Sequence, residues 1–387
     1  MQITVAKRLQ QTKEYYFSKK LQEIAQLNAQ GHQVLNLGIG SPDLPPHEEV
    51  IEEMHRISEQ PDAHGYQNYR GVPALRQAMS DFYKKHYHVN LDPEKEVLPL
   101  IGSKEGVVHV CMTYLEEGDE ALIPNPGYPA YASAVNLSGA KAVPYTLSEE
   151  NNWFPDLKSL EKQDLSKVKI MWVNYPHMPT GTPATLSFFE ELIDFGKRNG
   201  ILICHDNPYS FILNDTPLSI LQIQDAKEVA IELNSLSKSS NMAGWRVGML
   251  MGDEKRINEI LRFKTNMDSG MFLGIQMAAV KALQLGKEWY DVLNTIYKER
   301  REKVYKIMDA LGAEYSKKQS GLFVWAKIHD KYDSGYQVTD EVLDKARVFI
   351  TPGGIFGEAG EKYIRISLCA NTKKLDEALD RIKNTVK

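Results

Sequence analysis

The most reactive grouping in the sequence lies in residues 235–248, which read SLSKSSNMAGWRVG. Lys238 stands between serines, and Arg246 follows it by eight residues. Serine hydroxyls and a guanidinium can together hold a phosphate dianion, because the hydroxyls donate hydrogen bonds and the guanidinium carries a fixed charge. A nearby cation also favours the neutral amine of a lysine, and that amine can condense with an aldehyde. A solvated loop is the competing interpretation, since loops are often rich in Ser, Asn and Gly.

A second anion site is indicated by GSKEG at residues 102–106. Ser103 and Lys104 stand where a helix is expected to begin, and the unpaired backbone N–H groups of a helix N-terminus attract anions. Taken alone, the motif is more typical of an ordinary helix cap. Together with the two serines and the arginine around Lys238, it suggests a phosphate site beside an amine. An aldehyde that carries a phosphate suggests pyridoxal 5′-phosphate.

This cofactor makes further chemical demands, which other residues meet. Its ring nitrogen needs a carboxylate partner to stay protonated, and Asp206 follows a run typical of a buried strand. Tyr209 can donate a hydrogen bond to the phenolic oxygen, and Tyr128 in PNPGYPAY can stack on the ring. The carboxylate of an amino-acid substrate is best held by a guanidinium, which Arg365 in KYIRISL supplies. Alone, Asp206 would be interpreted as a solvated turn residue, and Arg365 equally as an edge-strand residue.

Several of these residues stand just after short apolar runs that have the composition of buried strands. The runs are residues 97–101, 120–124, 169–174, 201–206 and 229–233. Amphipathic segments alternate with them: one opens at Pro73 and another ends at Gly200, where these residue types favour helix boundaries. The alternation predicts an α/β fold with a mostly parallel central sheet flanked by helices. Ligands bind at the C-terminal edge of such a sheet, so the polar residues there are expected to meet.

The chain is long enough for two domains, and its character changes at about residue 272, where long helices begin. The later runs GLFVWAKI and KYIRISL suggest a short second sheet. We assign residues 46–271 to a large cofactor-binding α/β domain. We assign residues 1–45 and 272–387 to a smaller α+β domain, formed by the N-terminal segment and the C-terminal part.

Composition and charge exclude several classes of partner. The 387 residues are 42% hydrophobic and 25% charged, with a net charge of −5, which is ordinary for a soluble protein. No block of like charge stands out, so neither nucleic acid nor a membrane surface is expected as a partner. No apolar run has the length of a membrane span or the pattern of a signal peptide, so a cytoplasmic location is expected. The three cysteines are widely spaced, and no metal site is expected.

The order of the motifs resembles that of class I/II aminotransferases, which are pyridoxal-phosphate-dependent transferases of fold type I. YQNYRGVPALR, GSKEG, PNPGYPAY, DNPY, SLSKSSNMAGWRVG and YIRIS stand in the family's order, and the resemblance covers nearly the whole chain. It implies that Lys238 is the Schiff-base lysine. It also implies that Asp206 is the partner of the ring nitrogen and that Tyr209 is the donor to the phenolic oxygen.

The same resemblance assigns the remaining site residues. The cofactor-binding residues are Tyr66, Ser103, Lys104, Tyr128, Asp206, Tyr209, Ser235, Ser237, Lys238 and Arg246. The substrate-binding residues are Gly40 in LGIGSPDLPP, Asn174, and Arg365 as the clamp for the substrate carboxylate. Tyr66 matches a tyrosine that reaches the phosphate from the neighbouring subunit, which implies a homodimer with shared active sites.

The activity that the resemblance implies is the transfer of an amino group from an α-amino acid to a 2-oxo acid. The expected acceptor is 2-oxoglutarate, and Lys238 is the expected general base and acid. LGIGSPDLPP, GSKEG and NMAGWRVG are most similar to the branch that contains LL-diaminopimelate aminotransferases. Aspartate, aromatic amino acids and methionine stay open as donors. The alternatives are a lyase or decarboxylase on the same scaffold and a non-catalytic regulator.

One position departs from the family pattern. Met178 in NYPHMPTG stands where the family has an asparagine before Pro-Thr-Gly. A thioether has no N–H or O–H, so the sequence lacks a donor that usually helps Tyr209 to bind the phenolic oxygen. The departure leaves the fold and the lysine chemistry in place, and it predicts a change in how the protein tunes its cofactor.

Overall fold

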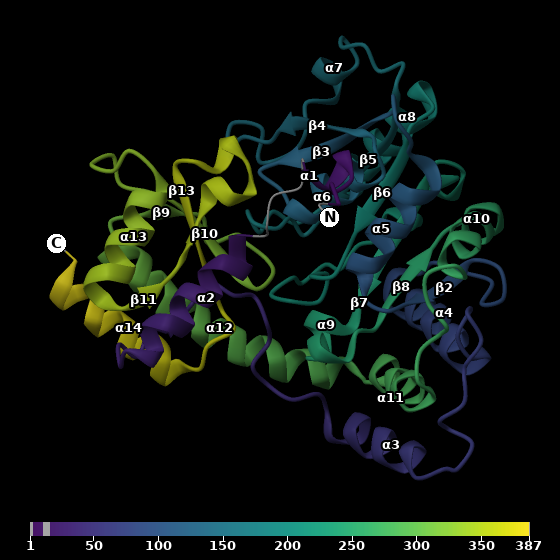
Figure 1. Ribbon diagram of the computed structural model, residues 1–387, viewed down its shortest axis with the longest axis horizontal. Coiled ribbons are helices and arrows are strands. Elements are labelled where there is room, and N and C mark those ends of the chain that lie inside the picture. The colour runs from purple at the N-terminus through teal and green to yellow at the C-terminus, as the bar shows by residue number, and fades with distance from the viewer. Residues whose placement is uncertain (1–2, 11–15, 387) are drawn as a thin grey trace.

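The computed structural model describes residues 3–10 and 16–386, and Figure 1 shows their arrangement. The α-helices are α1 Lys7–Gln10, α2 Tyr16–Ala29, α3 Glu48–Ser58, α4 Pro73–Tyr87, α5 Ser103–Tyr114, α6 Pro129–Leu137, α7 Leu157–Leu160, α8 Leu186–Asn199, α9 Leu236–Ser239, α10 Glu254–Lys264, α11 Leu273–Gln284, α12 Lys287–Ala310, α13 Gly335–Ala346 and α14 Thr372–Thr385. The strands are β1 Leu35–Asn36, β2 Val97–Leu100, β3 Glu120–Asn125, β4 Lys141–Thr146, β5 Val168–Asn174, β6 Leu202–Asp206, β7 Ala230–Ser235, β8 Gly248–Met251, β9 Glu314–Tyr315, β10 Phe323–Lys327, β11 Val348–Phe349, β12 Thr351–Pro352 and β13 Tyr363–Ser367. Within the described part of the chain, no helix has the length and apolar character needed to cross a membrane.

The central sheet has seven strands in the order β2-β8-β7-β6-β5-β3-β4. Its pairs from β7 through β6, β5 and β3 to β4 are parallel, whereas β8 is antiparallel to both β2 and β7. The five apolar runs predicted as strands are β2, β3, β5, β6 and β7, so the α/β prediction is confirmed. The sequence analysis did not name β4 and β8.

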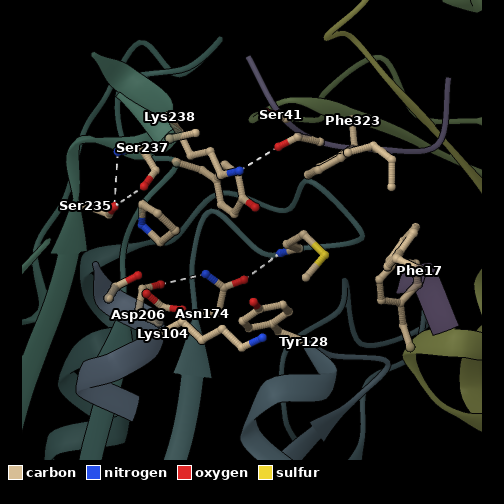
Figure 2. A pocket seen from close by; sticks show the side chains of 18 of the residues that line it. Phe17, Ser41, Lys104, Tyr128, Asn174, Asp206, Ser235, Ser237, Lys238 and Phe323 are labelled. Atoms are coloured by element: carbon tan, nitrogen blue, oxygen red, sulfur yellow. Dashed lines mark hydrogen bonds between the residues drawn. The ribbon is translucent and has the colours of Figure 1, made fainter. Parts of the chain in front are cut away.

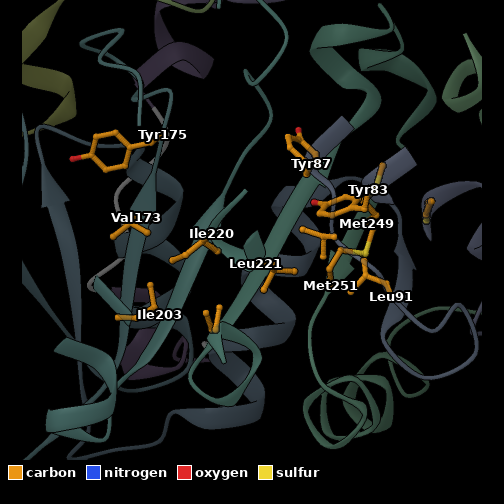
Figure 3. Close-up of a cluster of buried hydrophobic side chains, with 14 of the residues drawn as sticks. Tyr83, Tyr87, Leu91, Val173, Tyr175, Ile203, Ile220, Leu221, Met249 and Met251 are labelled. Carbon is orange, nitrogen blue, oxygen red and sulfur yellow. The ribbon is translucent and has the colours of Figure 1, made fainter. Parts of the chain in front are cut away.

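Both faces of this sheet are covered, because the residues of its central strands alternate between two hydrophobic clusters. Met171 and Val173 of β5 belong to the cluster in Figure 3, which also contains buried residues of α4, α8 and α11. Ile170 and Trp172 belong to the cluster on the other face, with buried residues of α5, α6 and α10. Burying a large apolar side chain contributes about 1.5–3 kcal/mol, so these alternating contacts fix which strand residues point to each face.

Local residue chemistry sets the helix boundaries, including the two that the sequence predicted at Pro73 and Gly200. The hydroxyl of Thr185 accepts a hydrogen bond from the backbone N–H of Phe188 at the start of α8. Gly200 ends that helix in the left-handed conformation, with φ of 65°, which glycine adopts without a steric penalty. Pro73 is the first residue of α4, where a missing N–H costs no helical hydrogen bond.

A smaller antiparallel sheet has the order β12-β13-β10-β9, and a hydrophobic cluster of its own covers it. Phe17 and Ile24 of α2 join this cluster, and β1 pairs with β11 in parallel. Figure 1 shows α2 on the same side of the molecule as the yellow C-terminal elements. Helix α11 instead packs against α3 and α4. The domain boundaries given above stay a prediction.

Candidate active site

A cavity of about 660 Å³ lies where strands of the central sheet end and elements of the smaller sheet approach them. The sequence-predicted residues that line it are Gly40, Ser103, Lys104, Tyr128, Asn174, Asp206, Tyr209, Ser235, Ser237, Lys238, Arg246 and Arg365. Figure 2 shows Ser235 and Ser237 at one end of the cavity, and Phe17 and Phe323 at the other. Lys238 projects between the two ends, opposite Asp206 and Asn174. The fold thus brings together residues that lie up to 325 positions apart, from Gly40 to Arg365.

The serine end of the cavity is built for an anion. Ser235 caps α9, with its hydroxyl accepting from the backbone N–H of Ser237 at 3.1 Å. Helix α5 begins at Ser103, directly after Gly102, which has φ of 86°. A Cβ added at Gly102 would stand 2.2 Å from Nη2 of Arg246, so the missing side chain is what lets the guanidinium lie against the start of α5. A helix N-terminus, two hydroxyls and a guanidinium suit a phosphate dianion.

Lys238 lies beside this anion site on α9, a one-turn helix between β7 and β8. Its ammonium nitrogen donates to the carbonyl of Gly40 at 2.6 Å. Burial is the main cause that lowers the pKa of Lys238, and the charges of Arg365 and Arg246 lower it further. A larger fraction of Lys238 is therefore in the neutral amine form than for an exposed lysine, and a nucleophilic amine must be neutral.

Asp206, the last residue of β6, is buried and only half paired. Its Oδ2 accepts from the hydroxyl of Tyr131 at 2.8 Å, whereas Oδ1 is buried and has no hydrogen-bond partner among the described residues. Burial raises the pKa of Asp206 to about 6, and the hydrogen bond from Tyr131 opposes that effect. A buried carboxylate oxygen without a donor fits a ligand that brings an N–H.

Asn174 joins neighbouring strand ends below the cavity. Its amide nitrogen donates to the backbone carbonyl of Asp206 at 2.6 Å, and its amide oxygen accepts from the backbone N–H of Met178 at 2.8 Å. The side chain thus fixes the end of β5 to the end of β6 and orders the loop that follows. The structure shows this bridging role directly, and contact of Asn174 with the substrate stays a prediction.

Two tyrosines flank the same space. Tyr128 precedes α6, and its ring meets that of Tyr131 edge to face, with centroids 5.6 Å apart. Burial raises the pKa of Tyr209 well above its usual value, so its hydroxyl keeps its proton and can donate. The ring of Tyr209 packs against Phe323 of β10, with centroids 6.0 Å apart.

Arg365 lies on β13, opposite Trp325 of β10. Strand β13 is paired on both sides, so the interpretation of Arg365 as an edge-strand residue is wrong. The side chain is 3% exposed, and its Nη2 donates to the carbonyl of Gly38 at 2.9 Å. Its Nη1 lies 3.1 Å from the sulfur of Met178, and the guanidinium covers the ring of Phe323 at 3.8 Å. These contacts hold a planar cation at the apolar end of the cavity, where it can meet a carboxylate.

Tyr66 is the predicted site residue that does not line the cavity. It is 93% exposed and lies between α3 and α4. Conversely, the sequence analysis missed Phe17, Phe323 and Tyr131, which do line the cavity. Tyr131 could have been noticed, because it stands one helical turn after Tyr128 and therefore on the same side of α6.

A group of three metal-capable side chains lies outside this cavity. Ligand atoms of Glu105, His109 and Asp268 lie within 4.8 Å of one another. The ammonium of Lys264 is 2.8 Å from Oδ1 of Asp268 and already supplies a positive charge there. The group therefore provides no argument for a metal ion.

The cavity combines an anion site, the amine of Lys238 and an oxygen of Asp206 that has no donor among the described residues. That combination fits a phosphate-bearing aldehyde with a ring N–H. In agreement, residues 32–382 match the family model described as aminotransferase class I and II, and the chain belongs to that family. It is a pyridoxal 5′-phosphate-dependent aminotransferase.

Two curated relatives that share one description are similar to this chain over almost its whole length. The chain is 40% identical to the LL-diaminopimelate aminotransferase of Dehalococcoides mccartyi strain CBDB1 over 380 residues, which cover 98% of each protein. It is 41% identical to the enzyme of that name from Halothermothrix orenii over 382 residues, again 98% of each. Among solved structures, substrate-bound BacF from Bacillus subtilis superimposes with a TM-score of 0.95 at 36% identity, covering 99% of this chain and 98% of that one.

Proposed function

We propose that the protein transfers the amino group of an α-amino acid to a 2-oxo acid, with 2-oxoglutarate as the acceptor. The observation that carries the proposal is the cavity, where the amine of Lys238 projects opposite the buried carboxylate of Asp206 and the guanidinium of Arg365 lines the same space. The family match favours this activity over a lyase, a decarboxylase or a non-catalytic regulator.

We assign each residue a role according to its position in the cavity. When bound, pyridoxal 5′-phosphate supplies an aldehyde that takes up the amino group and a ring that withdraws electrons from the substrate Cα. In our proposal the serine end and Arg246 hold its phosphate, Asp206 faces its ring nitrogen, and Tyr209 donates to its phenolic oxygen. Tyr128 covers its ring.

Arg365 and Lys238 act on the substrate. Arg365 binds the α-carboxylate through two parallel hydrogen bonds, which fixes the direction of the Cα–H bond. The amine of Lys238 removes the proton from Cα as a general base and later returns one as a general acid. The lowered pKa of Lys238 suits this exchange, because an amine that is easily deprotonated can serve in both directions.

The names of the relatives provide the first donor to test. We propose LL-diaminopimelate as the leading donor, because full-length relatives at about 40% identity bear that name. Aspartate, an aromatic amino acid and methionine form the comparison panel. In a homodimer, Tyr66 of each subunit would reach the phosphate held by its partner.

The test is a donor panel with 2-oxoglutarate, followed by measurement of glutamate formation. Lys238→Ala should abolish turnover with every donor and remove the visible absorbance of the lysine-bound cofactor. Lys141→Ala, at a surface lysine whose side chain is 72% exposed, should behave as wild type. Full transaminase activity in Lys238→Ala would refute the assignment of that lysine. Release of carbon dioxide or free ammonia without glutamate would instead indicate a decarboxylase or lyase.

A further inference from the structure

A fully buried pair of ionisable side chains lies directly beside Asp206, and the reaction described above does not use it. His205 on β6 and Glu232 on β7 are both 0% exposed. Nδ1 of His205 is 2.8 Å from Oε2 of Glu232. Nε2 of His205 is 2.9 Å from the backbone carbonyl of Tyr175, in the loop after β5. The imidazole thus links three neighbouring strands just below the cavity.

The partners of this imidazole decide its charge. A carbonyl oxygen only accepts, so Nε2 carries a hydrogen. Oε2 of Glu232 accepts from the backbone N–H of Ile220 at 3.0 Å and lies 2.9 Å from the hydroxyl of Ser219. Oxygens that already accept from these groups favour a carboxylate, so the hydrogen between the pair belongs to Nδ1 of His205. The imidazole is then doubly protonated and positively charged.

The other oxygen of Glu232 is occupied as well. Oε1 accepts from the hydroxyl of Tyr83 at 2.7 Å and from the amide of Asn207 at 3.3 Å. Such a full set of donors offsets the cost of burying a carboxylate, which an unpaired buried charge would not recover. The network therefore maintains a buried ion pair.

Asp206 is the nearest functional neighbour of that pair along the chain. Burial is the largest influence on its pKa and raises it; the hydrogen bond from Tyr131 and then the charge of His205 lower it. Glu232 raises the pKa by less than His205 lowers it, and Lys238 lowers it too. The cation behind Asp206 hence favours an ionised carboxylate on a residue that burial alone would tend to keep protonated.

We propose that His205 is a positioning residue whose imidazolium, held by Glu232 and the Tyr175 carbonyl, keeps Asp206 ionised to receive the ring N–H of the cofactor. The inference rests on the proposed role of Asp206 in facing that nitrogen. In this proposal the positive charge of His205 stabilises the negative charge of Asp206, the next residue along β6.

The first experiment measures the charge of His205 itself. In protein labelled with ¹⁵N-histidine, both ring nitrogens of His205 should show the chemical shifts of protonated nitrogens at pH 7.5. The signals are assigned by their loss in His205→Gln. A His205 with one unprotonated ring nitrogen would overturn the proposal, whatever the role of Asp206.

The second experiment isolates the interaction at the ring nitrogen. The affinity of the apo-protein is measured between pH 5 and 9 for pyridoxal 5′-phosphate and for the analogue in which carbon replaces the ring nitrogen. The ratio of the two affinities should fall as Asp206 becomes protonated, because the analogue has no ring N–H to lose. In His205→Gln the midpoint of that fall should move upward by roughly one pH unit, the size of a typical perturbation by a nearby charge.

Two further variants keep this test decisive. His205→Gln/Glu232→Gln removes both charges, so it folds without an unpaired buried carboxylate; its midpoint should move upward by a smaller amount. Tyr83→Phe disturbs the same network without removing the imidazolium, and should lower the melting temperature while leaving the midpoint unchanged. Midpoints equal to that of wild type in both His205 variants would refute the proposal.

The role of Asp206 is tested separately in the same assay. Asp206→Asn should abolish the preference for pyridoxal 5′-phosphate over the carbon analogue at every pH. If Asp206→Asn keeps the wild-type preference, the assigned role of Asp206 is wrong. If it loses the preference while the His205 variants titrate as wild type, the role of His205 alone is wrong.

Discussion

The burial of the Asp206 carboxylate lowers the stability of the folded apo-protein at neutral pH. Burial raises the pKa of Asp206 to about 6, so in the apo-protein the protonated form favours the folded state. Its stabilising contribution is complete below about pH 4, the pKa range of an unfolded aspartate, and is lost as the pH rises through 6. At neutral pH the apo-protein thus carries a buried charge, and one of its oxygens has no donor within residues 3–10 and 16–386.

Asp206→Asn should therefore stabilise the apo-protein at pH 7.5 but not at pH 4. A difference of about two pKa units corresponds to roughly 3 kcal/mol at most. Urea unfolding of wild type and variant across this range measures the difference in free energy of unfolding. With the cofactor bound the order should reverse, because the variant loses its charged partner. A difference that does not change with pH would show that Asp206 does not titrate between pH 4 and 7.

Met178 is the other residue with a distinctive effect. Its sulfur lies in the cavity wall beside Arg365, 3.1 Å from Nη1, and it offers no N–H or O–H to a ligand. His177 does not replace it as a donor, because that side chain does not line the cavity and its Nδ1 is bonded to Thr180 at 2.9 Å. In the proposed arrangement, the phenolic oxygen of the cofactor would therefore have one donor fewer than in the family pattern.

Met178→Asn should lower the pKa of the cofactor-bound Lys238 nitrogen by about one unit. A new donor disperses the negative charge of the phenolic oxygen, and that charge is what keeps the nitrogen protonated. A charge-assisted hydrogen bond of about 1.5 kcal/mol corresponds to roughly one unit. Absorbance titration of the holoenzyme measures it, with Met178→Leu as a control of similar size that adds no donor. Coincident curves for wild type and Met178→Asn would place the residue away from the phenolic oxygen.

At the level of elements, the segment from Leu37 to Pro46 follows β1, where the backbone N–H of Leu37 donates to the carbonyl of Phe349, and two further contacts hold its C-terminal end. Asp43 accepts from Nη1 and Nη2 of Arg300 on α12, at 2.6 and 3.0 Å. The carbonyl of Pro45 accepts from the amide of Asn241 at 3.1 Å. Between these anchors and β1 lies Gly40, whose carbonyl receives the amine of Lys238. Through Asp43 and Arg300, the segment links the cavity to α12.

Asp43→Asn should lower the free energy of unfolding by about 1–2 kcal/mol, because it replaces a two-point ionic contact to a buried guanidinium with a neutral one. The KM for the amino donor should rise as well, since Gly40 is less firmly held. Asp291→Asn is the matched control: its pair with Lys287 is exposed, and about 0.3–0.5 kcal/mol is expected there. Equal effects of the two substitutions would mean that the Arg300 contact does not anchor the segment.

At the scale of the whole molecule, the loop around Tyr66 presents exposed side chains that suit contact with a second subunit. Tyr66, Tyr69 and Met267 are 93%, 41% and 59% exposed. The loop that carries the tyrosines is held in place, because the ammonium of Lys264 donates to the carbonyl of Tyr69 at 3.1 Å. An ordered loop that presents a hydroxyl to solvent fits the proposed delivery of Tyr66 to a partner's phosphate site.

Tyr66→Phe should leave a dimer intact and weaken cofactor retention by about tenfold or more, as expected for the loss of a hydrogen bond to a charged group. Light scattering gives the oligomeric state, and equilibrium dialysis of pyridoxal 5′-phosphate gives the affinity. A wild-type monomer that holds the cofactor tightly would contradict shared sites.

Short-range chemistry allowed much of this protein to be predicted from its sequence. The apolar runs that became β5, β6 and β7 are recognisable because buried strands need continuous apolar residues. Gly200 and Pro73 mark helix ends through their own backbone preferences. The lysine, serine and arginine of residues 235–248 stand on one short segment, so their common purpose is visible without a fold.

Only the tertiary structure decided which residues far apart in the sequence form an ion pair or a hydrogen bond. Nothing near β8 indicates that it inserts between β2 and β7 in the antiparallel direction. The contact of Arg365 with Met178, 187 residues away, and that of His205 with Glu232 depend on which strands lie side by side. The pKa of Asp206 follows from its burial, which no local pattern reveals. Residue type sets what a side chain can do, whereas its neighbours and its distance from water set its protonation state and its partner.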